Sequence, residues 1–165
     1  MIIVVAGVSG SGKSSVAALL AGRLRWPFMD GDLLQPAWNV AKMSSGVPLT
    51  DHDRVPWLRD VAAWIDQQIA EGQSAVVVCS ALKRSYRDML TERRPAVRIA
   101  FLEIDREICA KRLAARQGHF FDPRLLGSQF TDLEPPAPDE PAVVTIHVMA
   151  EAEATAEEIA RVLNV

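Results

Sequence analysis

The sequence is poor in the features that mark secreted, membrane-bound and nucleic-acid-binding proteins. It contains two cysteines, Cys79 and Cys109, without the spacing of a metal site, which favours a reducing, cytoplasmic setting. No basic segment precedes the short apolar start, and no uncharged run approaches the length of a membrane span. The formal net charge of −3 gives no indication of a nucleic-acid-binding surface. We therefore expect neither a membrane nor a nucleic acid as a partner.

What is present is the composition of one compact domain. The chain of 165 residues has the length of a single domain and is large enough to bury a substantial core. Hydrophobic residues make up 49% and charged residues 24%, which is ordinary for a globular protein. We expect a single domain over residues 1–165.

The first 24 residues predict a strand, a glycine-rich loop and a helix in succession. Residues 2–6 form an uncharged, branched run that is typical of a buried strand. Residues 7–14, Gly-Val-Ser-Gly-Ser-Gly-Lys-Ser, fit the phosphate-loop pattern G-x-x-x-x-G-K-[ST] at every fixed position. The helix that follows has an apolar face made of Val16, Leu19, Leu20 and Leu24. This context makes a chance match of the loop improbable.

The chemistry of such a loop explains its residue types. Glycine and serine let successive backbone N–H groups turn inward toward a polyphosphate, and the helix N-terminus adds unpaired donors. Lys13 would reach the β- and γ-phosphates as a catalytic cation, and the Ser14 hydroxyl would ligate Mg²⁺. We expect a bound nucleoside triphosphate, held by Gly7, Val8, Ser9, Gly10, Ser11, Gly12, Lys13, Ser14 and Ser15.

Two carboxylates follow the second predicted strand, at residues 26–29. Asp30 and Asp32 flank Gly31 at the carboxyl end of that strand, which is where open α/β sheets bind ligands. A solvated Asp-Gly turn is the alternative for this pair. The third predicted strand, residues 75–79, ends in Ser80 and not in the aspartate that many phosphate-loop enzymes use near the metal. Asp30 or Asp32 therefore becomes the expected outer partner of the metal.

The stretch from about residue 33 to 59 predicts a substrate-binding segment of one or two short helices. It is interrupted by prolines and is too polar for a core. Its candidate ligand groups are Gln35, Trp38, Asn39, Lys42, Asp51, Asp53 and Arg54. A helical stripe of apolar residues follows and ends near Gly72.

The second half of the chain predicts two more strands, at residues 97–102 and 142–148, and a mobile lid between them. Arg112 and Arg116 lie four apart on a helix expected over residues 106–117, and so share one face. A lid over about residues 112–140 would carry these cations to the phosphates and exclude water. A surface helix with two solvated arginines fits the charge pattern equally well.

The chain resembles the gluconate kinase family, and the similarity spans nearly its whole length. The middle segment is more specific than the loop. The residues that carry the resemblance are residues 7–14, Asp30-Gly31-Asp32, Pro36, Asn39, Lys42-Met43, Gly46, Pro48-Leu49, Asp51, Asp53-Arg54, Pro56-Trp57-Leu58, residues 79–83, Tyr86-Arg87-Asp88, Arg116, Gly118-His119-Phe120, Ser128-Gln129-Phe130 and Leu133-Glu134. One departure is Gln35, where the family usually has histidine.

The resemblance implies a three-layer α/β fold, related to shikimate and adenylate kinases, with helices on both faces of a five-stranded parallel sheet of order 2-3-1-4-5. It also implies transfer of a phosphoryl group from ATP, with Mg²⁺, to the terminal hydroxyl of D-gluconate, and a homodimer. Two alternatives stay open: a kinase for another small acceptor, such as shikimate or a nucleotide, and a non-catalytic nucleotide-binding module.

Phosphoryl transfer depends on positioning and charge neutralisation, which assigns roles to the candidate residues. Asp32 is the expected base, with Asp30 supporting it or the metal. Arg54 is expected to hold the acceptor carboxylate through its planar, two-pronged guanidinium. The remaining expected contacts are Lys42, Ser80, Lys83 and Gln129 with the acceptor, Arg112 and Arg116 with the transferring phosphate, and His119 with nucleotide or acceptor.

Overall fold

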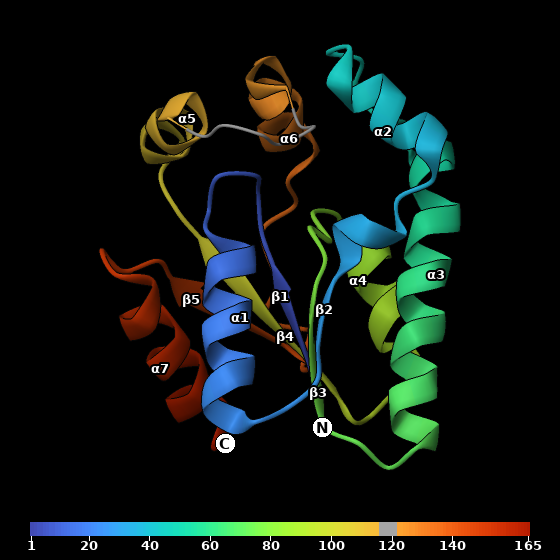
Figure 1. Cartoon of the computed structure of the whole chain (residues 1–165), viewed down its shortest axis with the longest axis vertical. Coiled ribbons are helices and arrows are strands. Elements are labelled where there is room, and N and C mark those ends of the chain that lie inside the picture. Colours follow the sequence, from blue (N-terminus) through green and yellow to red (C-terminus); the bar gives the residue numbers. More distant parts are fainter. Residues whose placement is uncertain (116–121) are drawn as a thin grey trace.

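The computed structural model describes residues 1–115 and 122–165, which fold around a five-stranded parallel sheet (Figure 1). The strands are β1 (Ile2–Ala6), β2 (Phe28–Asp30), β3 (Ala75–Val78), β4 (Val97–Glu103) and β5 (Val143–His147). They lie in the order β2-β3-β1-β4-β5, and every neighbouring pair is parallel. The predicted fold class and strand order are confirmed.

Helices cover both faces of the sheet and also lie beyond its carboxyl edge (Figure 1). The α-helices are α1 (Lys13–Leu24), α2 (Ala37–Ser44), α3 (Asp51–Ala70), α4 (Arg84–Thr91), α5 (Arg106–Ala115), α6 (Leu126–Asp132) and α7 (Ala152–Leu163), and the 3₁₀ helices are η1 (Gly31–Leu34) and η2 (Pro123–Leu125). Within the described ranges, none of these helices combines the length and apolarity that a bilayer crossing requires.

The core has two halves because successive residues of β1 face opposite sides of the sheet. Ile3 and Val5 pack with α1 and α7 on one side, whereas Ile2 and Val4 pack with α3 and α4 on the other. Both faces of β1 are fully buried, as its uncharged sequence predicts. Because neighbouring strands are all parallel, their carboxyl ends meet at one edge of the sheet, below α2, α5 and α6 (Figure 1).

The apolar face predicted for α1 is partly wrong. Leu19 is 37% exposed, and the buried residues of the helix are Val16, Ala17, Leu20 and Ala21. The helix packs against α7 as well as against the sheet, so its buried face is wider than a leucine stripe and shifts toward the alanines. Small alanine side chains let the helix approach its neighbours closely.

The predicted end of the substrate-binding segment at Arg59 does not coincide with the end of a helix. Helix α3 runs without a break from Asp51 to Ala70, although it contains Pro56. Thr50 and Asp53 form a reciprocal capping box that fixes where the helix begins. The first turns of α3 therefore belong to the candidate site, and its later turns belong to the core.

A buried ion pair holds the segment before β5 against α4. Arg87 is 1% exposed and donates to both carboxylate oxygens of Glu140, at 2.6 and 2.8 Å. Arg87 also donates to the backbone carbonyls of Leu82 and Glu134, each at 3.0 Å. Through Arg87, α4 is therefore joined to the loop after β3 at Leu82 and to the segment before β5 at Glu134 and Glu140.

Candidate active site

The glycine-rich loop adopts backbone conformations that glycine permits and other residues rarely do. Gly7, Gly10 and Gly12 have φ angles of 133°, 83° and 92°. A Cβ atom on Gly7 would lie 2.8 Å from the carbonyl oxygen of Leu102, so the loop also approaches β4 too closely for a side chain. Gly12 leads directly into α1, whose first turn has no side-chain cap, so its amides face the cleft in front of the loop.

We call the cleft in front of the loop the nucleotide cleft, because the sequence predicts a nucleotide there. It has a volume of about 210 Å³ and is lined by Ser9, Gly10, Gly12, Lys13, Ser14, Ser15, Asp32, Arg112 and Leu113. The Lys13 ammonium donates to the carbonyl oxygen of Val8 at 2.8 Å, which holds it along the loop. Removal of this ammonium from water lowers the pKa of Lys13, whereas the Asp32 carboxylate acts in the opposite direction. Arg112 donates to the carbonyl oxygen of Ser11 at 3.3 Å.

The Asp30-Gly31-Asp32 turn faces this loop and is not a freely solvated turn. The Asp30 carboxylate accepts from the Ser14 hydroxyl and from the backbone N–H of Asp32, each at 3.0 Å. Gly31 is buried, and a Cβ atom there would lie 2.2 Å from the carbonyl oxygen of Val78. The indole N–H of Trp57 donates to the Gly31 carbonyl at 2.7 Å, which anchors the turn to α3.

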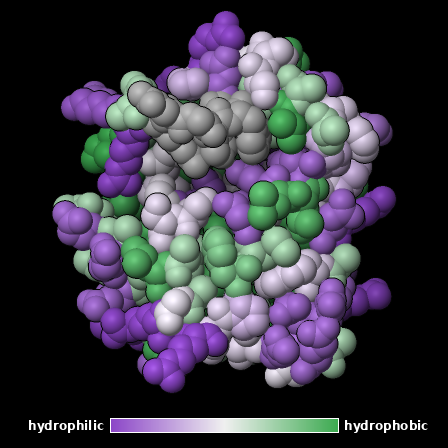
Figure 2. Space-filling view, viewed as in Figure 1, coloured by the Kyte–Doolittle hydropathy of each residue, from purple (hydrophilic) through white to green (hydrophobic). Residues whose placement is uncertain are grey.

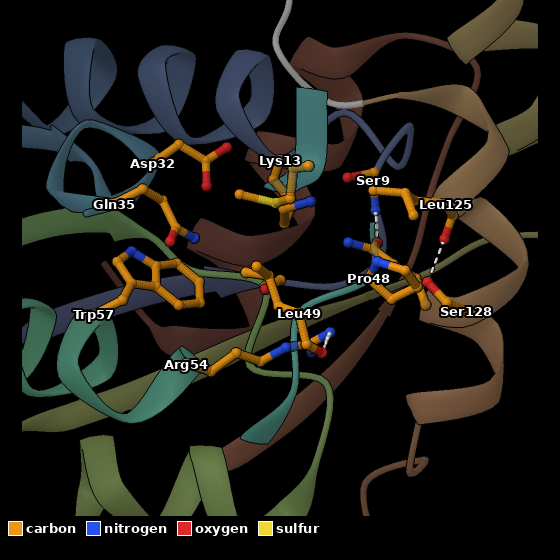
Figure 3. Close-up of a pocket in the computed structure, with 13 residues that line it drawn as sticks. Ser9, Lys13, Asp32, Gln35, Pro48, Leu49, Arg54, Trp57, Leu125 and Ser128 are labelled. Atoms are coloured by element: carbon orange, nitrogen blue, oxygen red, sulfur yellow. Dashed lines mark hydrogen bonds between the residues drawn. The ribbon is translucent and has the colours of Figure 1, made fainter. Parts of the chain in front are cut away.

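A second cavity opens beside the nucleotide cleft (Figure 3). We call it the acceptor cavity, after the acceptor site that the sequence predicts next to the phosphates. Its lining comes from the phosphate loop and the start of α1, from η1, α2 and the loops that follow them, from α3, from the loop after β3, and from η2 and α6. It comprises Ser9, Lys13, Asp32, Gln35, Met43, Pro48, Leu49, Arg54, Trp57, Ser80, Leu125, Ser128 and Gln129. Ser9, Lys13 and Asp32 line both cavities. The two cavities therefore meet at a lysine and a carboxylate.

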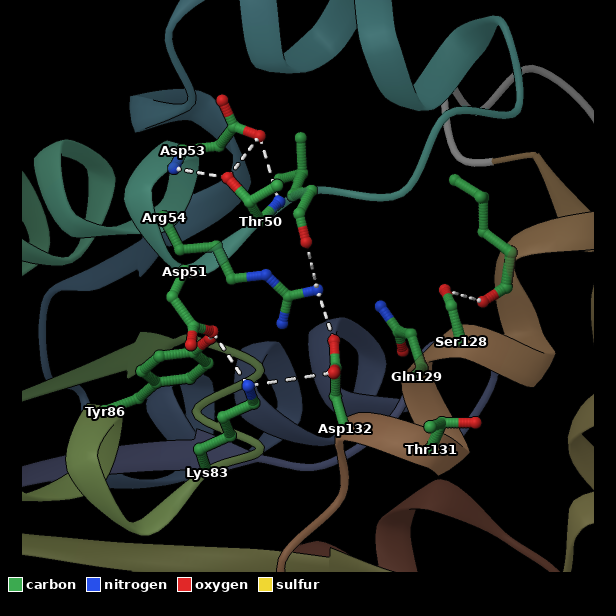
Figure 4. Close-up of polar contacts among 12 residues, drawn as sticks. Thr50, Asp51, Asp53, Arg54, Lys83, Tyr86, Ser128, Gln129, Thr131 and Asp132 are labelled. Atoms are coloured by element: carbon green, nitrogen blue, oxygen red, sulfur yellow. Dashed lines mark hydrogen bonds and ion pairs between the residues drawn. The ribbon is translucent and has the colours of Figure 1, made fainter.

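Arg54 lies at the wall of the acceptor cavity and is 6% exposed. Its Nη2 atom donates to Asp132 at 2.9 Å and to the Leu49 carbonyl at 3.3 Å, while its guanidinium lies 5.6 Å from the ring centre of Tyr86 (Figure 4). The buried Nε atom has no hydrogen-bond partner among the described residues. An unpartnered donor at a cavity wall is a candidate contact for an anionic ligand.

The two predicted lysine contacts lie outside the acceptor cavity and are paired with aspartates. Lys42 donates to Asp53 at 2.8 Å and holds the pKa of that carboxyl down, at about 2. Lys83 donates to Asp51 at 2.8 Å and lies 3.8 Å from Asp132 (Figure 4). Both lysines therefore tie α2, α3 and α4 together around the cavity.

Helix α6 reaches both parts of the site. The Gln129 carboxamide oxygen accepts from the backbone N–H of Ser9 at 2.6 Å, and Asp132, one turn later, pairs with Arg54. Both contacts join residues that lie far apart in the sequence. The helix thus joins the phosphate loop to the wall of the acceptor cavity.

Comparison with known proteins identifies the family. The family model described as an AAA domain matches residues 2–132. Gluconokinase from Gluconobacter oxydans is 50% identical over 143 residues, which cover 86% of this chain and 79% of that protein. The chain belongs to the gluconokinase family.

Solved structures agree with this family assignment. A sugar kinase from Janibacter sp. HTCC2649, in its unliganded form, is 39% identical with a TM-score of 0.89, and the match covers 99% of this chain and 94% of that one. A gluconokinase from Sinorhizobium meliloti 1021 is 43% identical with a TM-score of 0.78, and covers 98% and 94%.

In this gluconokinase-family chain, the structure gathers most of the predicted site residues at one place. Ser80 lines the acceptor cavity, and its carbonyl accepts from the N–H of Gly7 at 3.1 Å. Arg116 and His119 lie outside the described residues. Asp132 and Tyr86 were not predicted as site residues, because an aspartate near a helix end and a tyrosine on an apolar face carry no sequence signal of their contacts with Arg54.

A further groove next to the phosphate loop was also missed. It is lined by Ser11, Gly12, Ser15, Val16, Arg112, Val148, Met149, Ala150, Ala152 and Thr155. Arg112 lines both this groove and the nucleotide cleft. The small apolar residues after β5 give no pattern that sequence alone would assign to a ligand.

Proposed function

We propose that this protein catalyses the ATP-dependent phosphorylation of D-gluconate to 6-phospho-D-gluconate, as the name of its gluconokinase relatives describes. The observation that carries the proposal is the meeting of the nucleotide cleft and the acceptor cavity at Ser9, Lys13 and Asp32. A phosphate on the loop and a hydroxyl in the adjoining cavity would lie on either side of these residues. Positioning of this kind supplies most of the catalysis in phosphoryl transfer.

On the nucleotide side, the amides of residues 7–15 would hold the phosphates of ATP, and Lys13 would neutralise the charge that develops on the β- and γ-phosphates. Arg112, which borders both the cleft and the groove beside β5, would contact the phosphates from the other side. Arg116 and His119 keep their predicted roles in closing the site. The lid over about residues 112–140 likewise stays a prediction.

The residues next to the loop fit a magnesium ion. The Ser14 hydroxyl and the Asp30 carboxylate lie 3.0 Å apart, and hard oxygen groups of this kind are what Mg²⁺ uses in nucleotide sites. Mg²⁺ is usually held by one or two protein oxygens together with waters and phosphates, which suits so small a set. A metal ion held there would supply positive charge to offset that of the phosphates. Ser14 would then ligate it directly, with Asp30 behind.

On the acceptor side, Asp32 would accept the proton of the attacking hydroxyl, since its carboxylate borders both cavities. Arg54 would bind the gluconate carboxylate through donors that the Asp132 pair leaves available. Ser80 and Gln129 border the same cavity and would contact sugar hydroxyls. Lys42 and Lys83 would act from behind, through their aspartate partners.

A coupled assay of ADP release tests the function directly. Gluconate, shikimate and nucleoside monophosphates would each be supplied with ATP and Mg²⁺, and the product identified by ³¹P NMR. We expect turnover with gluconate and a phosphate monoester at C6. Turnover with another acceptor and none with gluconate would contradict the proposal, and binding of ATP without any acceptor turnover would favour a non-catalytic module.

The role of Asp32 is tested by Asp32→Asn. This isosteric change removes the proton acceptor, so we expect kcat to fall by about 10²–10⁴-fold while the affinity for ATP, measured by titration calorimetry, stays within a few-fold. Asp60→Asn, on the exposed face of α3, is the matched control. An Asp32→Asn enzyme with unchanged turnover would remove Asp32 as the base.

The single domain over residues 1–165, the cytoplasmic location and the homodimer also stay proposals. Both cysteines are free and buried, as suits a reducing compartment, and ATP is a cytoplasmic substrate.

Apolar surface gathers over β2 and η1, the edge of the sheet (Figure 2), where Phe28 and Leu33 are 40% and 80% exposed. Sedimentation of the wild type and of Leu33→Glu tests this dimer: a monomeric wild type would contradict it.

A further inference from the structure

A short relay of hydrogen bonds sets the orientation of Gln35 at the mouth of the acceptor cavity. Asn39 is fully buried on α2, and its Nδ2 atom donates to the backbone carbonyl of Asp53 at 2.9 Å. The same Nδ2 atom donates to the Gln35 carboxamide oxygen at 3.0 Å. The Gln35 carboxamide oxygen therefore points toward α2 and accepts this bond.

The orientation follows from hydrogen-bonding chemistry, because a backbone carbonyl can only accept. The amide nitrogen of Asn39, and not its oxygen, must face Asp53. That nitrogen then requires an acceptor from Gln35, so the Gln35 oxygen turns toward Asn39 and its Nε2 group is presented on the other side. Among the described residues, Nε2 donates to none.

The side on which Nε2 is presented belongs to the acceptor cavity. Gln35 lines that cavity together with Asp32 and Arg54 (Figure 3). Its backbone N–H donates to the carbonyl oxygen of Asp32 at 3.2 Å. This bond keeps Gln35 close to Asp32, the proposed base. Pro36, directly after it, restricts the backbone of Gln35 to the extended region that the structure shows.

We propose that Gln35 is a specificity-determining residue, whose Nε2 group donates to an oxygen of the acceptor and whose orientation is set by Asn39. The inference rests on the proposed function and assigns a contact within it. A sugar acid offers hydroxyl and carboxylate oxygens that can accept this bond. An acceptor with an apolar group or a donor at that point would leave Nε2 unpaired in the cavity and bind less well.

The variant Gln35→Glu separates this role from a structural one. It has the same shape, and one carboxylate oxygen still accepts from Asn39, but the other replaces the N–H donor that faces the acceptor. We expect the KM for gluconate to rise about 10- to 100-fold, with the KM for ATP within about twofold of wild type. The thermal midpoint should stay near that of wild type, because the bond to Asn39 is kept.

Two further variants complete the test. Gln73→Glu, in the exposed turn before β3, makes the same chemical change away from the cavity and should leave both KM values unchanged. Gln35→Met removes the donor without adding charge and should raise the KM for gluconate less than Gln35→Glu does. A folded Gln35→Glu enzyme whose KM for gluconate stays within twofold of wild type would overturn the inference alone. A wild type without gluconate turnover would overturn the proposed function and this inference with it.

Discussion

Removal of the Glu140 charge is expected to destabilise the protein strongly while leaving every proposed ligand contact in place. Glu140→Gln keeps the size of the side chain but takes the counter-charge away from Arg87, whose side chain is 1% exposed. The change also weakens the bond that Glu140 accepts from the N–H of Ala137 at 2.8 Å. The segment before β5 would lose its main attachment to α4.

The magnitude follows from the burial of the pair. Leaving one partner of a buried ion pair without its counter-charge costs about 3–5 kcal/mol. For a chain of this size, about 1 kcal/mol shifts the thermal midpoint by roughly 2–4 °C, so the midpoint of Glu140→Gln should fall by roughly 6–20 °C. Calorimetry or circular dichroism at pH 7 measures this directly.

The dependence on pH has a definite sign. The Arg87 guanidinium lowers the pKa of Glu140 below its ordinary value of 4.5. The pair therefore contributes its full stability above pH 4.5, and loses it as pH falls through the lower pKa of the folded state. We expect the difference between wild type and Glu140→Gln to be constant near neutral pH and to shrink in acid.

A surface pair in the same chain provides the control. Arg161 and Glu158 form an exposed pair on α7 at 2.6 Å, so Glu158→Gln should leave the thermal midpoint nearly unchanged. Equal midpoints for Glu140→Gln and wild type would refute the reasoning. So would a destabilisation that does not shrink in acid, because the effect would then arise from shape and not from charge.

Two further changes test the site itself. Gly31→Ala should unfold or strongly destabilise the protein, because its Cβ atom would lie 2.2 Å from the Val78 carbonyl, whereas Gly22→Ala on α1 meets nothing within 4 Å and should stabilise it by up to about 1 kcal/mol; equal thermal midpoints for the two would contradict this. Arg54→Leu should raise the acceptor KM by an amount equivalent to about 2–5 kcal/mol, measured by steady-state kinetics, and weaker ATP binding instead would place Arg54 on the wrong ligand.

Local sequence determined the parts of this protein in which neighbours along the chain act together. The phosphate loop was predictable because two glycines, a lysine and a serine at fixed spacing, at residues 7, 12, 13 and 14, have one well-known conformational use. The buried strands were predictable because a parallel sheet covered on both faces requires uncharged, branched runs. The strand order came with the family resemblance and not from these patterns.

Tertiary structure decided which charged side chains face a ligand and which face each other. From sequence, Lys42, Lys83 and Arg54 were all expected to contact the acceptor, and Arg54 was preferred for the carboxylate only because of its two-pronged guanidinium. The fold directs both lysines onto aspartates outside the cavity and leaves Arg54 at the cavity wall, with Asp132 from a helix 78 positions away.

The same reason explains the buried pair of Arg87 with Glu140 and the relay from Asn39 to Gln35. The partners in the ion pair are 53 positions apart, and the relay depends on a backbone carbonyl whose direction is set by α3. The residue type determines what bonds a side chain can form, but the packing of helices and strands determines which partner it meets. Residues with several possible partners are therefore assigned only once the elements that carry them are in place.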